Sequence, residues 1–108
     1  MTNPFNDQTI FMSACDQSVD AYNAEQYALY VDLITEEYHE LKQAIEDRDR
    51  VEQLDALIDI LVVTIGAINS MGADGAGAWS EVMRTNFAKI DPETGKVRKR
   101  EDGKVLKP

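Results

Sequence analysis

The chain has 108 residues, one cysteine and a net charge of −9, a length that fits one domain with a modest core. Because a lone cysteine forms no internal disulfide, and the sequence shows no signal peptide and no apolar run of bilayer length, we expect a cytoplasmic protein without a membrane role. Residues 1–83 carry three Lys or Arg against 16 Asp or Glu, and residues 84–108 carry eight against four. This acidic body argues against nucleic acid as a partner, and the basic arm is too small and mixed to form a nucleic-acid patch.

The first two helices are predicted from apolar periodicity. The first is expected to begin after an N-cap at Asn6 or Asp7 and to turn toward the core a face with Phe11, Cys15, Ser18 or Val19, and Tyr22. A second helix over 24–47, capped by Asn23, carries an apolar stripe of Tyr27, Val31, Ile34, Tyr38, Leu41 and Ile45. Between them Gln17 is a candidate to face a ligand, with plain solvation as the alternative.

A short polar turn at residues 47–50 predicts that the third helix packs antiparallel to the second. This helix is expected to reach about Met71, and the β-branched run 62–65 leaves a strand as a minor alternative. The glycine-rich residues 72–77 end it, a fourth helix follows over 78–87, and residues after 90 form two short extended pieces around a turn, or an arm that orders on binding. The predicted fold is therefore an all-α, four-helix bundle in a single domain, 1–108, with a helical body over 1–89 and a basic C-terminal arm over 90–108.

Six acids lie at helical spacing on the second and third predicted helices. They are Glu36, Glu37 and Glu40 before the turn and Glu52, Asp55 and Asp59 after it. At about 100° per residue, the acids on each helix gather on one stripe, and those after the turn span roughly 60°. If the helices pack antiparallel, residues whose numbers sum to about 96 lie level, which brings Glu37, Glu40, Asp55 and Asp59 to one height.

So many carboxylates at one place repel one another unless a cation is present. Hard oxygen donors suit Mg²⁺, with Mn²⁺ as a substitute. The competing interpretation is a solvated acidic helix face, since charged residues are mostly exposed.

These motifs resemble the MazG-like all-α NTP pyrophosphohydrolases, which include all-α dUTPases and phosphoribosyl-ATP pyrophosphohydrolases. Glu36-Glu37-x-x-Glu40 is similar to the family's EExxE motif, and Glu52-x-x-Asp55 to its downstream ExxD. Further similarity to a phage and bacterial branch runs through 55–66, 81–89 and 101–108, so the resemblance covers most of the chain from about Gln26 onward.

The resemblance implies Mg²⁺-dependent hydrolysis of an NTP or dNTP to the monophosphate and pyrophosphate, with a house-cleaning or phosphoribosyl-ATP-like substrate. It implies catalytic roles for Glu36, Glu37 and Glu40, and metal binding by Glu37, Glu40, Glu52, Asp55 and Asp59. The expected substrate-binding residues are Gln17, Asn86, Lys89, Lys104 and Lys107, with Arg84 a weaker candidate; simple solvation is the alternative for the lysines. The competing function is a non-catalytic, oligomeric helical protein that binds metal or a partner.

Apolar residues spread over more than one side of the predicted helices. Examples are Tyr27, Tyr30, Val62, Val63, Ile65 and Trp79. Because four short helices cannot cover so many faces, we expect a homo-oligomer, a dimer or tetramer, with sites near the subunit interfaces.

Overall fold

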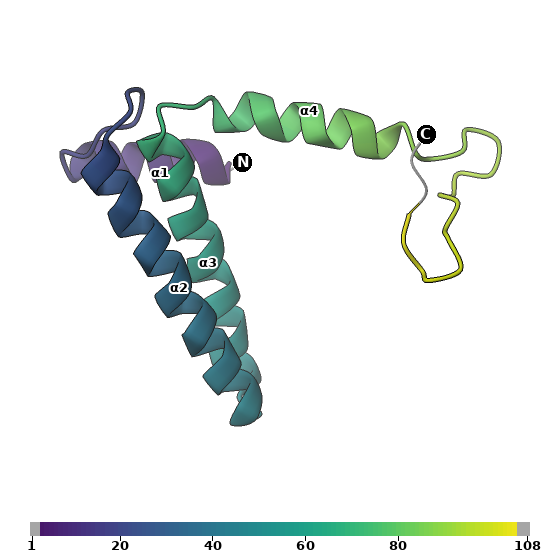
Figure 1. The fold of residues 1–108 in the computed structure, drawn as a ribbon, viewed down its shortest axis with the longest axis horizontal. Helices are drawn as coiled ribbons and strands as arrows, with labels where there is room; N and C mark the ends of the chain where they lie inside the picture. Colours follow the sequence, from purple (N-terminus) through teal and green to yellow (C-terminus); the bar gives the residue numbers. More distant parts are fainter. Residues whose placement is uncertain (1–2, 106–108) are drawn as a thin grey trace. The chain divides into compact units, whose positions relative to one another are not determined.

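A computed structural model describes residues 3–105, which form four helices (Figure 1). They are α1 Pro4–Ala14, α2 Ala24–Glu46, α3 Arg50–Ser70 and α4 Gly75–Phe87. Within the described residues the only β pairing is three isolated bridges. The all-α prediction is confirmed, and the strand alternative at 62–65 is wrong because those residues lie inside α3.

The chain divides into two compact units, an N-terminal unit Met1–Gly75 and a C-terminal unit Ala76–Pro108. None of the helices among the described residues is long and apolar enough to cross a membrane. The single domain, its boundary near residue 89 and the cytoplasmic location stay predictions.

Helix α1 begins earlier than the sequence pattern indicated. Its N-cap is Asn3, whose Oδ1 accepts hydrogen bonds from the Phe5 and Asn6 amides at 2.9 and 3.3 Å. Pro4 fits the first helical position because its missing N–H would have no helical partner there. The prediction of Asn6 or Asp7 as the N-cap is therefore wrong.

The buried face of α1 also differs from the prediction. Gln8 and Met12 are buried, whereas Phe11 and Cys15 are exposed. The helix ends at Ala14, and Asp16 takes a left-handed φ of 59° that redirects the chain. The remaining predicted positions, Ser18, Val19 and Tyr22, consequently lie outside any helix.

Helices α2 and α3 form an antiparallel hairpin that supplies most of the packing in the N-terminal unit (Figure 1). The two helices are tightly packed at Gly66, where an added Cβ would overlap the ring of Tyr30. Nearer the turn that joins the two helices, Gln53 Nε2 donates to the Ala44 carbonyl at 3.4 Å. Both pairs fit the predicted register, in which the numbers of level residues sum to about 96.

The stripe that α2 buries is not the predicted one. Tyr30 and Ala44 are buried, Glu37 between them is half-buried, and Val31, Tyr38 and Ile45 are exposed. The line of contact runs through positions seven residues apart, which face the small α3 residues Ala56, Gly66 and Ala67. The predicted stripe lies on one side of this line, which is why only some of it is covered.

Polar side chains attach α1 and the following loop to the hairpin. Asn69 Nδ2 donates to Thr9 Oγ1 at 3.1 Å, and Met12 packs in a core with Tyr30, Val63 and Ala67. Gln26 donates to Ser70 Oγ at 2.8 Å and also bonds both backbone groups of Ser18. The loop is thereby held against the end of the hairpin farthest from the α2–α3 turn.

The C-terminal unit contains nearly all of α4 and two successive tight turns. Bridges pair Ile90 with Val97 and Lys99 with Val105. Gly95 and Gly103 supply the positive φ angles that these turns require, 70° and 84°. This segment of the chain fits the predicted short extended arm.

Candidate functional site

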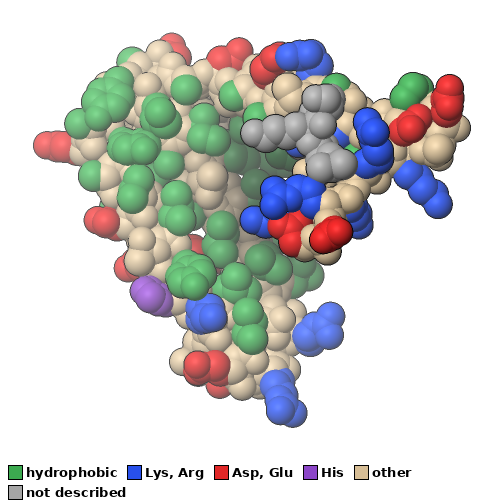
Figure 2. Space-filling view, turned by 45° about the vertical axis from the view of Figure 1, so that its right-hand side comes forward, with side chains coloured by type: hydrophobic (Ala, Val, Ile, Leu, Met, Phe, Trp, Pro, Cys, Tyr) green, Lys and Arg blue, Asp and Glu red, His purple; other side chains and the backbone are tan. Residues whose placement is uncertain are grey.

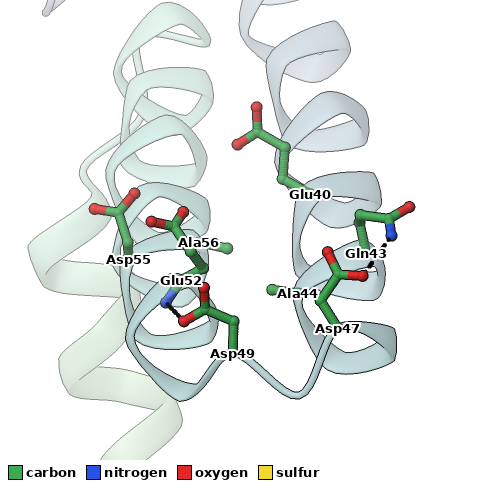
Figure 3. A pocket seen from close by; sticks show the side chains of 8 residues that line it. All are labelled: Glu40, Gln43, Ala44, Asp47, Asp49, Glu52, Asp55 and Ala56. Carbon is green, nitrogen blue, oxygen red and sulfur yellow. Dashed lines mark hydrogen bonds between the residues drawn. The ribbon is translucent and has the colours of Figure 1, made fainter.

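Acidic residues line a pocket of about 470 Å³ between α2 and α3, beside the turn that joins them (Figure 3). Its lining is Glu40, Gln43, Ala44, Asp47, Asp49, Glu52, Asp55 and Ala56. The small side chains of Ala44 and Ala56 belong to this lining, as do both members of the predicted level pair, Glu40 and Ala56. The structure thus brings Glu40, Glu52 and Asp55 to one site.

The turn contributes two acids, Asp47 and Asp49, for which the sequence pattern predicts only a place in the turn. Asp49 is the N-cap of α3 and accepts from the Glu52 amide at 3.1 Å. Asp47 Oδ1 accepts from Gln43 Nε2 at 3.1 Å. The sequence did hold a signal for Asp47. Gln43 follows Glu40, and Asp47 follows Gln43, at helical spacing, so Asp47 lies on the same helix face as Glu40.

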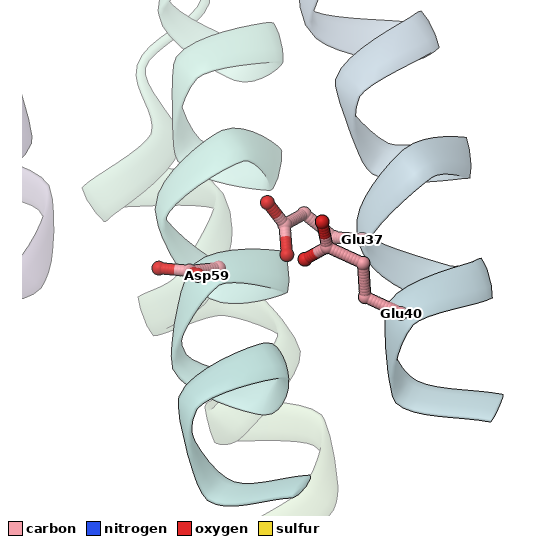
Figure 4. A group of neighbouring side chains, drawn as sticks. All are labelled: Glu37, Glu40 and Asp59. Carbon is pink, nitrogen blue, oxygen red and sulfur yellow. The ribbon is translucent and has the colours of Figure 1, made fainter. Parts of the chain in front are cut away.

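Three carboxylates converge about one helical turn beyond the pocket, on the side away from the loop that joins α2 to α3. Glu37, Glu40 and Asp59 each offer an oxygen, and these oxygens lie within 4.8 Å of one another. Figure 4 shows the Glu37 and Glu40 side chains reaching from α2 toward α3, where Asp59 lies. The register explains the meeting, because residues 37 and 59 are level in the hairpin.

Glu37 is the most perturbed acid of this group. Its Oε2 is buried and has no hydrogen-bond partner among the described residues. The pKa of the Glu37 carboxyl is raised to about 7, and burial is the largest cause. A side-chain hydrogen bond with Glu40 and the negative charges of Glu40, Asp59 and Asp55 also contribute to the rise. The pKa of Asp59 is raised by burial and then by Asp55 and Glu40. Without a cation, the folded site therefore resists full ionisation.

No basic side chain relieves this repulsion in the described structure. Its two ion pairs, Arg84 with Glu81 and Arg100 with Asp102, both lie in the C-terminal unit. A buried carboxylate oxygen without a donor, beside two further carboxylates, fits a hard divalent cation such as Mg²⁺. The residues present therefore suit the predicted cofactor.

The other predicted site residues are less closely tied to this cluster. Glu36 is exposed and is not one of the three converging carboxylates. Gln17 lies in the loop after α1, where its Oε1 accepts a hydrogen bond from the Tyr30 hydroxyl at 2.6 Å. The structure thus gives the Gln17 side chain a hydrogen bond within the fold, and its role in substrate binding stays a prediction.

The basic candidates belong to the C-terminal unit. Lys89 Nζ donates to Asn86 Oδ1 at 3.0 Å, and Lys104 is exposed, with its amide donating to Asp102. Arg84 is engaged by Glu81. Lys107 lies outside the described residues. Their role toward phosphate stays a prediction.

Comparison with known proteins bears on what this acidic site does. None of the curated proteins matches the chain. The family model for phosphoribosyl-ATP pyrophosphohydrolase matches residues 7–86, which include the five acids of the two motifs and also Asp59. This match confirms the resemblance drawn from the acidic spacing, and it indicates a hydrolase of the pyrophosphohydrolase kind. Since the matched region is well over half of the chain, the protein belongs to the phosphoribosyl-ATP pyrophosphohydrolase family.

Proposed function

We propose that the protein is a Mg²⁺-dependent nucleoside triphosphate pyrophosphohydrolase. It would convert an NTP or dNTP and water into the monophosphate and pyrophosphate, with a house-cleaning or phosphoribosyl-ATP-like nucleotide as its substrate. The observation that carries the proposal is the convergence of Glu37, Glu40 and Asp59 around a buried oxygen that has no donor among the described residues. The family match supports the same reaction class.

In this proposal Glu37, Glu40 and Asp59 hold the cation, and Glu52 and Asp55 extend the ligand set along the pocket toward the turn. A bound divalent ion offsets the charge of the polyphosphate and lowers the pKa of a water molecule. The carboxylates fix the position of the cation. The negatively charged phosphate oxygens can then approach the acidic pocket at the place where the cation neutralises the carboxylates.

The remaining residues act on the water and on the substrate. A carboxylate, for which Glu36 is the candidate, accepts a proton from water as the water oxygen bonds to phosphorus and the phosphoanhydride bond breaks. Lys89, Lys104 and Lys107, with Asn86, would donate to phosphate oxygens and balance the charge that leaves with pyrophosphate.

A nucleotide panel tests the proposal. Ribo- and deoxyribonucleoside triphosphates and phosphoribosyl-ATP would each be incubated with the protein in Mg²⁺ or in EDTA, and pyrophosphate measured. We expect release from at least one nucleotide in Mg²⁺ and none in EDTA. Mg²⁺ binding by calorimetry without pyrophosphate from any nucleotide would favour the competing function, a non-catalytic metal-binding or interaction protein.

A further inference from the structure

A groove of about 390 Å³ lies between α1 and α3 in the N-terminal unit. Its α3 wall is apolar and includes Ile58, Leu61, Val62 and Ile65, and its α1 wall combines the ring of Phe11 with the polar side chains of Asp7 and Gln8. Hydrophobic side chains gather over the helices on the face of the molecule shown in Figure 2, so exposed apolar residues alone do not single out this groove. Its concave shape and its few polar groups do, because small-molecule sites have this composition.

The groove borders the acidic cluster around the circumference of α3. Val62 follows Asp59 by three residues, so the two side chains are neighbours on the helix surface. Ile58 stands in the same relation to Asp55. Each of these steps leads about 60° farther from the side of α3 that contacts α2. A nucleotide whose phosphates lie at the acidic cluster can therefore reach the groove with its base, with the sugar between them.

Phe11 gives the groove an aromatic surface. Its ring is 63% exposed, although the sequence pattern predicts that it faces the core. The opposite wall ranges from Ile58, which is 52% exposed, to Ile65, which is 2% exposed, so it extends from the surface into the interior of the unit. A flat, apolar ring fits between an aromatic side chain and an aliphatic wall, and bases of every kind stack on aromatic side chains.

Asp7 and Gln8 add hydrogen-bonding groups to the α1 wall. The Asp7 carboxylate is exposed, and neither ion pair of the described residues involves it. An ionised carboxylate only accepts hydrogen bonds, whereas the Gln8 amide, in a residue that is 8% exposed, both donates and accepts. Adenine, cytosine and guanine carry an amino group that donates to a carboxylate, but uracil and thymine place carbonyl oxygens there, which a carboxylate repels.

We propose that this groove binds the base of the nucleotide substrate, stacked on Phe11, and that Asp7 selects bases that carry an amino group. The inference rests on the proposed function, because phosphates held at the acidic cluster determine where the base can lie. Charge favours a base over a second copy of the chain as the occupant. Residues 1–83 carry 16 acids against three basic residues, so a second acidic body would be repelled, whereas a base is neutral.

Equilibrium binding tests the stacking contact without depending on hydrolysis. Non-hydrolysable α,β-methylene analogues of ATP, CTP, GTP and UTP would be titrated into the full chain in Mg²⁺ by calorimetry. Phe11→Ala should weaken the binding of every analogue by about tenfold, since one stacking surface is lost. Ile10→Ala is the matched control, because Ile10 is the next residue of α1, is 62% exposed and does not line the groove; its affinities should equal those of the parent.

The same titrations test the choice of base. The parent should bind at least one amino-bearing analogue about tenfold more tightly than the UTP analogue. Asp7→Asn should bring that ratio close to one, because an amide donates as well as accepts. Asp20→Asn makes the same change of charge at an exposed residue outside the groove and should keep the ratio. Affinity for Mg²⁺ alone should be the same in the parent and both variants.

The outcomes separate this groove from the proposed reaction. Nucleotide hydrolysis with parent-like affinities and base preference in both Phe11→Ala and Asp7→Asn would overturn the groove and leave the proposed function standing. Binding that responds to both substitutions, without pyrophosphate from any nucleotide, would support the groove and reject the reaction. Failure of the parent to bind any analogue would overturn the proposal. So would a Phe11→Ala protein that changes its sedimenting mass but not its affinities, since a second copy would then cover the groove.

Discussion

Replacing Glu37 with glutamine should stabilise the cation-free protein above neutral pH. The pKa of Glu37 is raised from 4.5 to about 7 in the folded state, so between these values the folded chain holds a proton that the unfolded chain has lost. The free energy of unfolding therefore falls as pH rises from 4.5 to about 7, and it stays low above that range. Glutamine keeps the size of the side chain and removes this dependence.

The size of the effect follows from the same two values. The difference between 4.5 and about 7 sets a ceiling of about 3 kcal/mol. Screening by solvent at a half-buried carboxyl reduces this to about 1–2 kcal/mol. We therefore expect Glu37→Gln to exceed the parent by that amount at about pH 8 and to equal it near pH 4.

Urea unfolding in EDTA at several pH values measures the difference, because the chelator removes any cation that would stabilise ionised Glu37. Glu36→Gln is the matched control, since Glu36 is the exposed neighbour on the same helix, and its pH profile should follow the parent. A Glu37→Gln protein that loses stability with pH as steeply as the parent would refute the argument from burial and repulsion.

Three further predictions test the site and its scaffold. Mg²⁺ at about 100 times its dissociation constant should stabilise the parent by about 2.7 kcal/mol and Glu40→Gln much less, whereas the exposed Glu46→Gln should respond like the parent; equal shifts in thermal melts would argue for a solvated acidic face. Gly66→Ala should destabilise the hairpin, because overlap with Tyr30 costs about 1–3 kcal/mol against a helix-propensity gain of roughly 1 kcal/mol; a more stable variant in urea would count against the close approach. Asn23→Ala should lose about 1 kcal/mol, since Asn23 Oδ1 caps α2 at 3.1 Å from the Gln26 amide, and unchanged stability would show that the cap is dispensable.

The long helices could be predicted because local signals and periodicity agree there. Asn23 and Asp49 cap α2 and α3, and no proline interrupts either helix. The same agreement indicated the antiparallel register, which the Tyr30–Gly66 contact bears out. Helix α1 lacked such agreement, because its cap and first proline precede the apolar pattern that indicated it.

The meeting of the acids followed from the register, but the burial of Glu37 did not. The apolar stripe of Tyr27, Ile34 and Tyr38 suggested that bulky residues mark the contact between the helices. The buried line of α2 runs instead through Tyr30, Glu37 and Ala44, where α3 presents the small residues Ala56 and Gly66. Position 37 lies on that line, which places a carboxylate where periodicity alone indicated an apolar neighbour.

Pyrophosphate release by the parent and by Glu40→Gln, compared in Mg²⁺ with the most reactive nucleotide, tests the central claim most directly. Monophosphate and pyrophosphate should appear in equal amounts with the parent and with Glu46→Gln. Glu40→Gln should be slower by orders of magnitude, since one carboxylate of the cluster is lost while the helix is retained. Equal turnover by folded parent and Glu40→Gln, or no pyrophosphate from any nucleotide with either protein, would contradict the assignment of this cluster as a catalytic metal site.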